Sequence, residues 1–364
     1  MKVALVHDWL VSRGGAENVL YDIHTLFPKA PIYTLVYDAK RAPEWTRECD
    51  IRTTGIQNIP LSTKLYKNML SFMPKAWESL DLMEYDLIIS SCSSCAKGVL
   101  TRPDAIHICY CHTPIRYIWD MYYEYMKSSG LIKSLAMKMV IPKLRLWDYL
   151  ATQRVDFFVS NSAYVSQRIK KYYRRDSKVI YPGCHINEYP LAMQDGGYYL
   201  IVSRFVHYKR IDLAVMACNK LGKRLIIVGK GDEEKKLKKI AGPTVEFKGF
   251  LSDTEIANLY LNAKAFIFPG DEDFGITPVE AQSAGVPVLA YGHGGALETV
   301  LDGKTGLFFK EQTVDSLVEC ISRFEEKGVL FNKEEIRKES IKFSTERFLR
   351  EFKDYVDSVI TKDR

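Results

Sequence analysis

Short apolar runs alternate with longer amphipathic stretches along almost the whole chain, and this rhythm constrains the fold more than any other feature. Strands that alternate with helices form parallel sheets with helices on both faces. The rhythm occurs twice in succession, so it predicts an α/β protein of two Rossmann-like, doubly wound domains. Strands are expected at 2–7, 86–91, 105–110, 156–160, 178–181, 198–203, 224–228, 245–247, 265–268, 287–290 and 306–309. Helices are expected at 15–26, 162–171, 210–221, 232–240, 253–262, 276–284 and 314–326.

A cluster of Pro and Gly residues at 182–196 marks the expected boundary between the two domains. The chain has 364 residues, which suits two domains of about 150–200 residues each. We therefore assign 1–183 to a first domain and 184–343 to a second. The tail at 344–364 is expected to form one amphipathic helix, because its aromatic and aliphatic residues recur near helical spacing.

Composition indicates a cytoplasmic protein. The N-terminal apolar run is too short for a signal peptide, and no segment approaches the roughly 18 apolar residues of a membrane span. Eight cysteines fit a reducing compartment, which keeps thiols free. The net charge of +6 indicates an anionic partner such as a nucleotide, a phosphate or a lipid surface, and no nucleic acid is expected.

The strongest functional signal is the stretch 269–290, PGDEDFGITPVEAQSAGVPVLA. It follows a predicted strand and opens a helix, whose free amide N–H groups and positive dipole end form an anion site. Glu272 lies in the loop, and Glu280 lies in the helix, where a carboxylate can accept hydrogen bonds from a ribose diol. Either Glu alone is more simply a solvated surface residue, but the whole string favours a ligand site. The residues expected around the helix start are Phe274, Gly275, Ile276 and Thr277.

Two further loops after strands carry residues suited to phosphate. Arg204 is expected to leave a strand and Lys209 to start the next helix. Two fixed cations across one loop can grip a diphosphate as it departs, although capping of helix ends is the alternative. Gly14 and Gly15 turn the first strand into a helix, where backbone amides can face a phosphate. Simple turn chemistry is the commoner explanation for such a pair, which is neither GxGxxG nor a Walker loop.

His112 follows a strand and precedes Thr113-Pro114, so it is expected in a loop at the ligand cleft. There it could donate a hydrogen bond to a sugar hydroxyl. A purely structural histidine is the alternative.

Two patterns could indicate a metal, and neither is favoured. Residues 271–273 match the DxD pattern of metal-dependent sugar transferases, but Arg204 and Lys209 already offer the countercharge. The pairs Cys92/Cys95 and Cys109/Cys111 flank strands that are expected to be buried, so a zinc or redox site is unfavoured as well. We expect no metal and no other cofactor.

These motifs together resemble those of the GT-B-fold retaining glycosyltransferases, a group that includes glycogen synthases, sucrose synthases and the phosphatidylinositol mannosyltransferase. The E-x7-E pattern from Glu272 to Glu280 and the pair of Arg204 and Lys209 carry the resemblance, which covers nearly the whole chain. The opening HDW, the following GGAE and the stretch CHTPIRYIWD are similar to bacterial mannosyltransferases that build O-antigen and related polysaccharides. One departure is VS, rather than the commoner VG, before Arg204.

The resemblance implies two domains that face each other across a cleft, with the C-terminal helix crossing back to the first domain. It assigns the ribose to Glu280, and the transferred sugar to Glu272, to the amides of 274–276 and to His112. It assigns the diphosphate to Arg204 and Lys209, with Gly15 approaching from the first domain. The residues expected near the base are Gly229, Lys230, Phe250 and Leu251.

No second carboxylate is placed as a nucleophile, so retention would proceed on one face, with the departing phosphate accepting the acceptor's proton. The expected donor is GDP-mannose, and the expected acceptor is a glycan or a lipid-linked saccharide. A GT-B-fold nucleotide-sugar epimerase and an inactive nucleotide-sugar-binding protein are the alternatives.

The stretch 121–150 mixes Lys and Arg with Tyr, Trp, Leu and Met, a composition that suits an anionic membrane surface. The protein would then lie peripherally on the cytoplasmic face of the membrane. An ordinary core-packing helix pair with solvated cations is the alternative.

Overall fold

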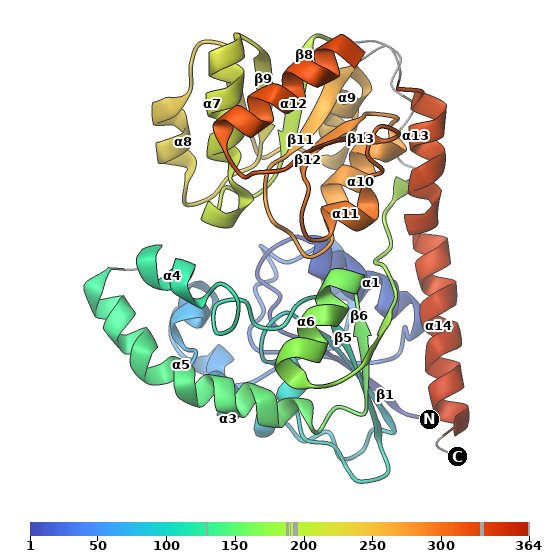
Figure 1. The fold of residues 1–364 in the computed structure, drawn as a ribbon. Coiled ribbons are helices and arrows are strands. Elements are labelled where there is room, and N and C mark those ends of the chain that lie inside the picture. The colour runs from blue at the N-terminus through green and yellow to red at the C-terminus, as the bar shows by residue number, and fades with distance from the viewer. Residues whose placement is uncertain (129, 187–188, 190, 192–195, 328–330, 363–364) are drawn as a thin grey trace. The chain divides into compact units, whose positions relative to one another are not determined.

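The computed structural model describes residues 1–128, 130–186, 189, 191, 196–327 and 331–362. The chain divides into two compact units (Figure 1), of which unit 1 comprises Met1–Tyr181 with Leu349–Arg364 and unit 2 comprises Pro182–Phe348. The stretch 182–196, where the sequence suggested a boundary, lies partly outside the described residues.

Unit 1 is built on a seven-stranded parallel sheet of order β3-β2-β1-β4-β5-β6-β7. Its strands are β1 (Val3–His7), β2 (Ile32–Thr34), β3 (Ile51–Thr53), β4 (Leu87–Cys92), β5 (Ile106–Cys111), β6 (Phe157–Ser160) and β7 (Ser177–Val179). Its helices are α1 (Gly15–Leu26), α2 (Ser62–Leu65), α3 (Met73–Glu78), α4 (Tyr122–Ser128), α5 (Leu131–Thr152) and α6 (Ala163–Tyr173). The strand order reverses at β1, which pairs with both β2 and β4.

Unit 2 has a six-stranded parallel sheet of order β10-β9-β8-β11-β12-β13. Its strands are β8 (Tyr198–Val202), β9 (Arg224–Val228), β10 (Val245–Gly249), β11 (Ala263–Phe268), β12 (Val288–Tyr291) and β13 (Gly306–Phe309). Its helices are α7 (Ile211–Leu221), α8 (Glu234–Ile240), α9 (Asp253–Asn262), α10 (Ile276–Ser283), α11 (Ala296–Thr299), α12 (Val314–Lys327) and α13 (Lys333–Ser340). Here the order reverses at β8, which pairs with both β9 and β11.

Both strand orders are the doubly wound Rossmann arrangement, so the prediction of two such domains is confirmed. In open α/β sheets, ligands bind outside the carboxyl ends of the strands where the order reverses. The loops after β1 and β4 in unit 1, and after β8 and β11 in unit 2, are therefore the places to look for a site. The strands β2 and β3 were not predicted, because three residues each are too few to show a strand pattern.

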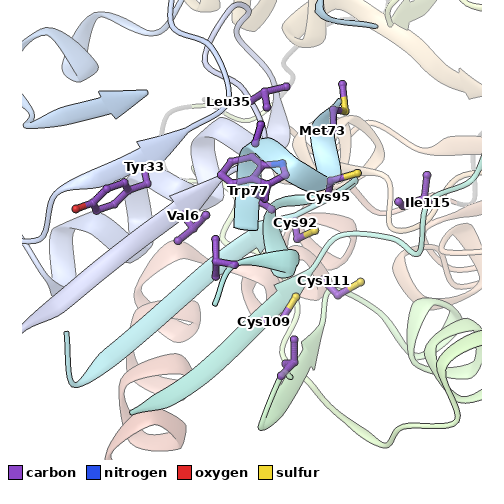
Figure 2. Close-up of a cluster of buried hydrophobic side chains, with 14 of the residues drawn as sticks. Val6, Tyr33, Leu35, Met73, Trp77, Cys92, Cys95, Cys109, Cys111 and Ile115 are labelled. Atoms are coloured by element: carbon purple, nitrogen blue, oxygen red, sulfur yellow. The ribbon is translucent and has the colours of Figure 1, made fainter. Parts of the chain in front are cut away.

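The core of unit 1 contains the four cysteines that the sequence singled out (Figure 2). Cys92 is the last residue of β4 and Cys95 lies in the loop after it, while Cys109 and Cys111 lie on β5. All four are buried with Trp77 in one cluster. Burial raises the pKa of the thiols of Cys92, Cys95 and Cys109, so they stay protonated and pack as small apolar groups. Among the described residues, no group of three or more His, Cys, Asp or Glu side chains could hold a metal ion.

The C-terminal helix α14 (Thr345–Lys362) begins in unit 2, and its residues from Leu349 onward group with unit 1. Its apolar face is buried through Phe352, Val356 and Val359, and the ring centroid of Phe352 lies 6.1 Å from that of Tyr110. The amphipathic pattern in the tail thus serves to cover unit 1. Residues 363–364 of the expected helix lie outside the described residues.

Candidate active site

The loop after β8 carries the two cations predicted to hold a diphosphate. Lys209 was expected to start α7. It lies instead at the end of a short 3₁₀ turn, His207–Lys209. Arg210 follows in the left-handed conformation, with φ of 48°, and this break delays the helix until Ile211. Arg204 is exposed at the end of β8.

The 3₁₀ turn brings Lys209 into an ion pair with Glu272, from the loop after β11. Both side chains are largely buried, with 15% and 16% of their surfaces exposed. A small cavity beside the pair is lined by residues that include Ser203, Pro269 and Gly270. Two of the predicted catalytic residues thus meet at the point where the strand order of unit 2 reverses.

Neighbouring loops fix the position of Glu272. Its backbone carbonyl accepts a hydrogen bond of 2.8 Å from the amide of Gly295. Gly295 must be a glycine, because a Cβ there would come within 2.4 Å of the Cα of Phe274. At the other end of the loop, the Gln312 side chain donates to the carbonyl of Pro269 at 2.9 Å. The carboxylate is therefore held by bonds at both ends of its loop.

Gly275 caps α10 with a φ of 91°, a conformation that side-chain-bearing residues rarely adopt. Ile276 and Thr277 form the half-buried first turn, as the sequence indicated. Phe274 points into the core instead of outward, and its ring lies 5.4 Å from that of Phe343. At this helix start the backbone amides, and not the Phe274 side chain, are suited to a ligand.

Glu280 lies one turn further along α10 and is half-buried. Its carboxylate accepts a hydrogen bond of 3.3 Å from the hydroxyl of Tyr260, which is fully buried. Burial and the Glu280 charge raise the pKa of Tyr260, so the phenol stays protonated and remains a donor. This bond holds the carboxylate on the side of α10 that faces Tyr260, a residue of α9.

The four residues predicted near the base follow β9 and β10. Gly229 has a φ of 131°, and a Cβ there would lie 1.9 Å from the carbonyl oxygen of Ser203. The Gly229 amide donates to Gly249 at 2.7 Å, so the loops after β8, β9 and β10 are joined through their backbones. Lys230 is exposed, Phe250 is 69% exposed, and Leu251 is half-buried.

The first two residues of the DxD-like pattern at 271–273 pair with other residues of the protein. Asp271 lies 3.0 Å from the Nδ1 atom of His293, which follows β12, and the middle residue pairs with Lys209 as described above. These contacts draw the carboxylates towards separate partners on different loops.

In unit 1, His112 directly follows β5 and forms part of a chain of hydrogen bonds. Its Nε2 atom lies 2.8 Å from the Ser91 hydroxyl, which lies 3.1 Å from the Nδ1 atom of His7. Burial lowers the pKa of His112 to about 4, and burial together with the nearby His112 lowers that of His7 to about 3. Both rings are therefore uncharged at neutral pH. The sequence did not identify His7 or Ser91 as site residues, although the HDW motif contains the first.

Asp8 fixes the loop after β4. Its carboxylate accepts hydrogen bonds of 2.6 to 2.9 Å from four successive backbone amides, those of residues 93–96. Burial raises the pKa of Asp8, while the amide bonds oppose this shift. The loops after β1 and β4, which flank the reversal of strand order in unit 1, are joined in this way.

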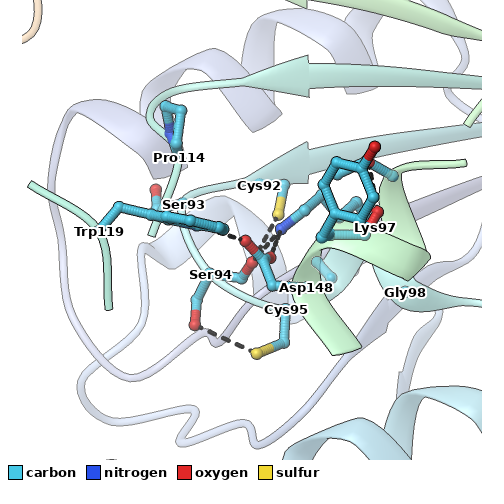
Figure 3. Close-up of polar contacts among 12 residues, drawn as sticks. Cys92, Ser93, Ser94, Cys95, Lys97, Gly98, Pro114, Trp119 and Asp148 are labelled. Atoms are coloured by element: carbon cyan, nitrogen blue, oxygen red, sulfur yellow. Dashed lines mark hydrogen bonds and ion pairs between the residues drawn. The ribbon is translucent and has the colours of Figure 1, made fainter. Parts of the chain in front are cut away.

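The loop continues into a buried ion pair (Figure 3). Lys97 and Asp148 lie 2.5 Å apart with almost no exposed surface, and Lys97 also donates to the Ser94 carbonyl at 2.8 Å. The second oxygen of Asp148 accepts a 2.8 Å bond from the indole of Trp119, in the CHTPIRYIWD motif. This network ties α5 and the segment after His112 to the loop after β4.

Gly14 and Gly15 lie at the start of α1. Gly14 is extended, with φ of −178°, and Gly15 is the first residue of the helix. The Glu17 carboxylate lies over this turn, since a Cβ on Gly14 would be 3.0 Å from one of its oxygens. A side chain at position 14 would therefore crowd the Glu17 carboxylate.

Known proteins match both units. Residues 13–188 match the family model for Glycosyltransferase Family 4, and residues 190–344 match the model for Glycosyl transferases group 1. The chain is 25% identical to alpha-1,3/1,6-mannosyltransferase ALG2 of Kluyveromyces lactis, across 100% of this chain and 86% of that protein. It is also 25% identical to ALG2 of Dictyostelium discoideum, across 84% of this chain and 85% of that one.

Solved structures share the fold. The HepE protein of Anabaena in complex with UDP has a TM-score of 0.71 and 18% identity, covering 98% of this chain and 100% of that one. Sucrose-phosphate synthase from Thermosynechococcus elongatus has a TM-score of 0.75 and 16% identity, covering 100% of both chains. With two matching family models, one on each Rossmann-like unit, this chain is a GT-B-fold glycosyltransferase with a family 4 first unit and a group 1 second unit.

Proposed function

We propose that this glycosyltransferase moves mannose from GDP-mannose to a glycan or lipid-linked saccharide, with retention and without a metal ion. The observation that carries the proposal is the ion pair of Lys209 and Glu272 at the reversal of strand order in unit 2. This pair supports the proposal because it brings together a lysine suited to a leaving diphosphate and a carboxylate suited to sugar hydroxyls. The mannosyl group is supported by the ALG2 mannosyltransferases, which are similar over most of their length.

The residues of unit 2 would divide the donor between them. Lys209 and the exposed Arg204 stabilise the charge that develops on the diphosphate, which is the largest electrostatic demand of the reaction. Glu280 accepts hydrogen bonds from the ribose, in the orientation that Tyr260 gives it. Glu272 and the amides at the start of α10 hold the sugar. The base would lie against the backbone of Gly229, Lys230, Phe250 and Leu251.

Retention would follow a one-face path. The departing diphosphate accepts the proton of the acceptor hydroxyl as the new bond forms, so no enzymatic nucleophile is required. Gly14 and Gly15 would present the backbone at the start of α1 to the phosphates. His112, uncharged at neutral pH, contributes a hydrogen bond to the sugar and no charge.

The test is transfer from a panel of nucleotide sugars to a lipid-linked saccharide, with the anomeric configuration of the product read by NMR. We expect GDP-mannose to be the best donor, an α-linked product, and GDP to bind more tightly than UDP. Tighter binding of UDP, the nucleotide in the HepE structure, would overturn the choice of donor. Donor turnover that does not depend on acceptor would overturn transfer itself.

Contact with an anionic membrane is a second part of the proposal. It involves fewer residues of α5 than the sequence suggested. Arg145, which the sequence suggested, is not available, because it donates to the Ile118 carbonyl at 2.9 and 2.6 Å and lies over Trp119. The remaining face of α5 carries an exposed apolar stripe flanked by exposed lysines. The stripe includes Leu135, Met139, Leu146 and Leu150, and the lysines are Lys138 and Lys143.

Each cation near an anionic surface contributes about 1 kcal/mol, so this contact would be weak and sensitive to salt. Co-sedimentation with phosphatidylserine vesicles at low and high salt tests it. We expect binding at low salt that falls when Lys138 and Lys143 become Gln. Binding that is absent, or unchanged in this variant, would leave α5 as an ordinary packing helix. Among the described residues, no helix is long and apolar enough to cross a bilayer.

A further inference from the structure

The hydrogen-bond chain of His112, Ser91 and His7 connects three neighbouring strands at the carboxyl edge of the unit 1 sheet. Its members lie at the end of β1, in β4 and directly after β5, which are adjacent in the sheet. His7 and Ser91 are buried, with 3% and 1% of their surfaces exposed, while His112 is half-buried. The chain therefore runs from the interior to the one ring that a ligand can reach.

The groups available allow two directions for these hydrogen bonds. A neutral imidazole has one N–H donor and one acceptor nitrogen, and a serine hydroxyl has a single proton. Either His7 donates to Ser91 and Ser91 donates to His112, or both bonds run the other way. Only the first direction leaves the proton of His112 on Nδ1, the ring nitrogen that is not turned towards Ser91.

With His7 as the donor, the Ser91 hydroxyl keeps its own proton for the other side. It donates to the Nε2 atom of His112 across 2.8 Å. An Nε2 atom that accepts this bond carries no proton, and the proton of the neutral ring must then be on Nδ1.

We propose that His7 and Ser91 are positioning residues that hold His112 as the Nδ1–H tautomer, an uncharged hydrogen-bond donor towards the transferred sugar. The choice of this tautomer rests on the proposed function, in which His112 donates to the sugar, whereas the coupling of His112 to His7 through Ser91 rests on the hydrogen bonds. An uncharged donor suits the reaction, because an imidazolium beside the ring would oppose the positive charge of an oxocarbenium-like transition state.

The chain offers a matched control in the same strand. Ser90 hydrogen-bonds the Nε2 atom of His107 at 2.9 Å, and both residues are fully buried. This pair joins β4 to β5 one position away from Ser91, so Ser90→Ala removes a similar bond without touching the chain to His112. Two variants separate the role of His7: His7→Asn keeps a donor near the position of Nδ1, and His7→Leu removes it.

The test is long-range ¹H–¹⁵N correlation NMR of the full chain labelled at its seven histidines, with His112 assigned by the loss of its signals in His112→Asn. We expect the Nδ1–H tautomer in the unmodified protein, in Ser90→Ala and in His7→Asn, and a mixture of tautomers in Ser91→Ala and His7→Leu. An Nε2–H ring in the unmodified protein, or no change in Ser91→Ala and His7→Leu, would overturn the proposal.

Transfer kinetics complete the test. Ser91→Ala and His7→Leu should lower kcat about three- to tenfold, the effect of one neutral hydrogen bond, with little change in the donor KM. His7→Asn should restore most of the loss. A tautomer change without any effect on kcat would overturn the catalytic half of the proposal. If no donor supports transfer by the unmodified protein, the proposed function fails while the NMR result still decides the tautomer.

Discussion

The carboxyl edges of the two sheets have the same strand topology, but charged groups line one edge and an uncharged group is accessible at the other. In unit 2 the groups at the reversal of strand order are charged and half-buried, with Lys209 paired to Glu272 and Arg204 exposed nearby. In unit 1 the group that a ligand can reach, His112, is uncharged and hydrogen-bonded to another neutral group. The charged residues that hold the loops at this edge, Asp8 and the pair of Lys97 and Asp148, are buried.

The difference follows from what each edge does with its charges. The carboxylate of Asp8 accepts hydrogen bonds from four backbone amides, and Lys97 is paired with Asp148 away from solvent. Asp8 and the Lys97–Asp148 pair therefore hold loops in place. These groups are almost fully buried, so a ligand does not reach them, whereas Lys209 and Glu272 keep 15% and 16% of their surfaces exposed. A leaving diphosphate needs cations, and a sugar that gains positive charge needs neutral donors. The two edges would meet these two demands separately.

The largest expected effect is on the stability of unit 1. Lys97→Met leaves Asp148 buried without its countercharge, which should lower the free energy of unfolding by about 3–5 kcal/mol. Urea unfolding measures this loss. The control is Lys170→Met, which breaks an exposed pair with Asp176 and should cost at most about 1 kcal/mol. Equal losses in the two variants would contradict a structural role for the buried charge.

The next effect concerns catalysis in unit 2. Lys209→Met removes a cation at the proposed diphosphate site, so transfer should fall by about 10²- to 10³-fold. It also leaves Glu272 without its countercharge, so transfer is measured at a temperature where the variant is folded. Lys220→Met is the control, because Lys220 lies on α7 and pairs only at the surface, with Asp315. Combining Lys209→Met with Glu272→Gln shows whether the two act as a unit, in which case the double variant is no slower than the slower single one. Near-normal transfer by Lys209→Met would contradict the charged role of this edge.

A smaller effect is expected at the ribose. Glu280→Gln removes charge-assisted hydrogen bonds, so the donor KM should rise about 10- to 100-fold. Tyr260→Phe keeps the carboxylate and removes the hydroxyl that bonds Glu280 and the Thr277 carbonyl, so its KM should rise less. Titration of GDP by calorimetry measures the same difference without turnover. A larger effect in Tyr260→Phe than in Glu280→Gln would show that packing, and not the carboxylate, determines binding.

Most residues of the candidate site in unit 2 could be grouped from sequence because they are close together along the chain. Glu272, Gly275 and Glu280 belong to one loop and the helix after it, so their spacing alone defines the motif. The pairing of Glu272 with Lys209 was not predictable, because it depends on the 3₁₀ turn that Arg210 interrupts. No sequence pattern predicts that this arginine adopts the left-handed conformation.

The unit 1 site was less predictable for the same reason. His7, Ser91 and His112 are 84 and 21 positions apart along the chain, and only the register of β1, β4 and β5 brings them together. Arg145 shows the reverse error. Its place in a basic stretch suggested a surface cation. In the folded chain its guanidinium instead donates two hydrogen bonds to the carbonyl of Ile118.

The smallest expected effect is that of removing divalent metal ions. Cations of the protein itself lie beside the proposed diphosphate site, and Asp271 is engaged with His293 instead of pointing with its neighbours at one centre. Transfer should therefore survive dialysis against EDTA, and Asp273→Asn should change it less than about threefold, within the range of an ordinary surface substitution. The comparison variant is Lys209→Met, which should be far slower with or without EDTA. A loss of activity on chelation that manganese or magnesium restores would instead assign the countercharge to a metal held by the 271–273 carboxylates.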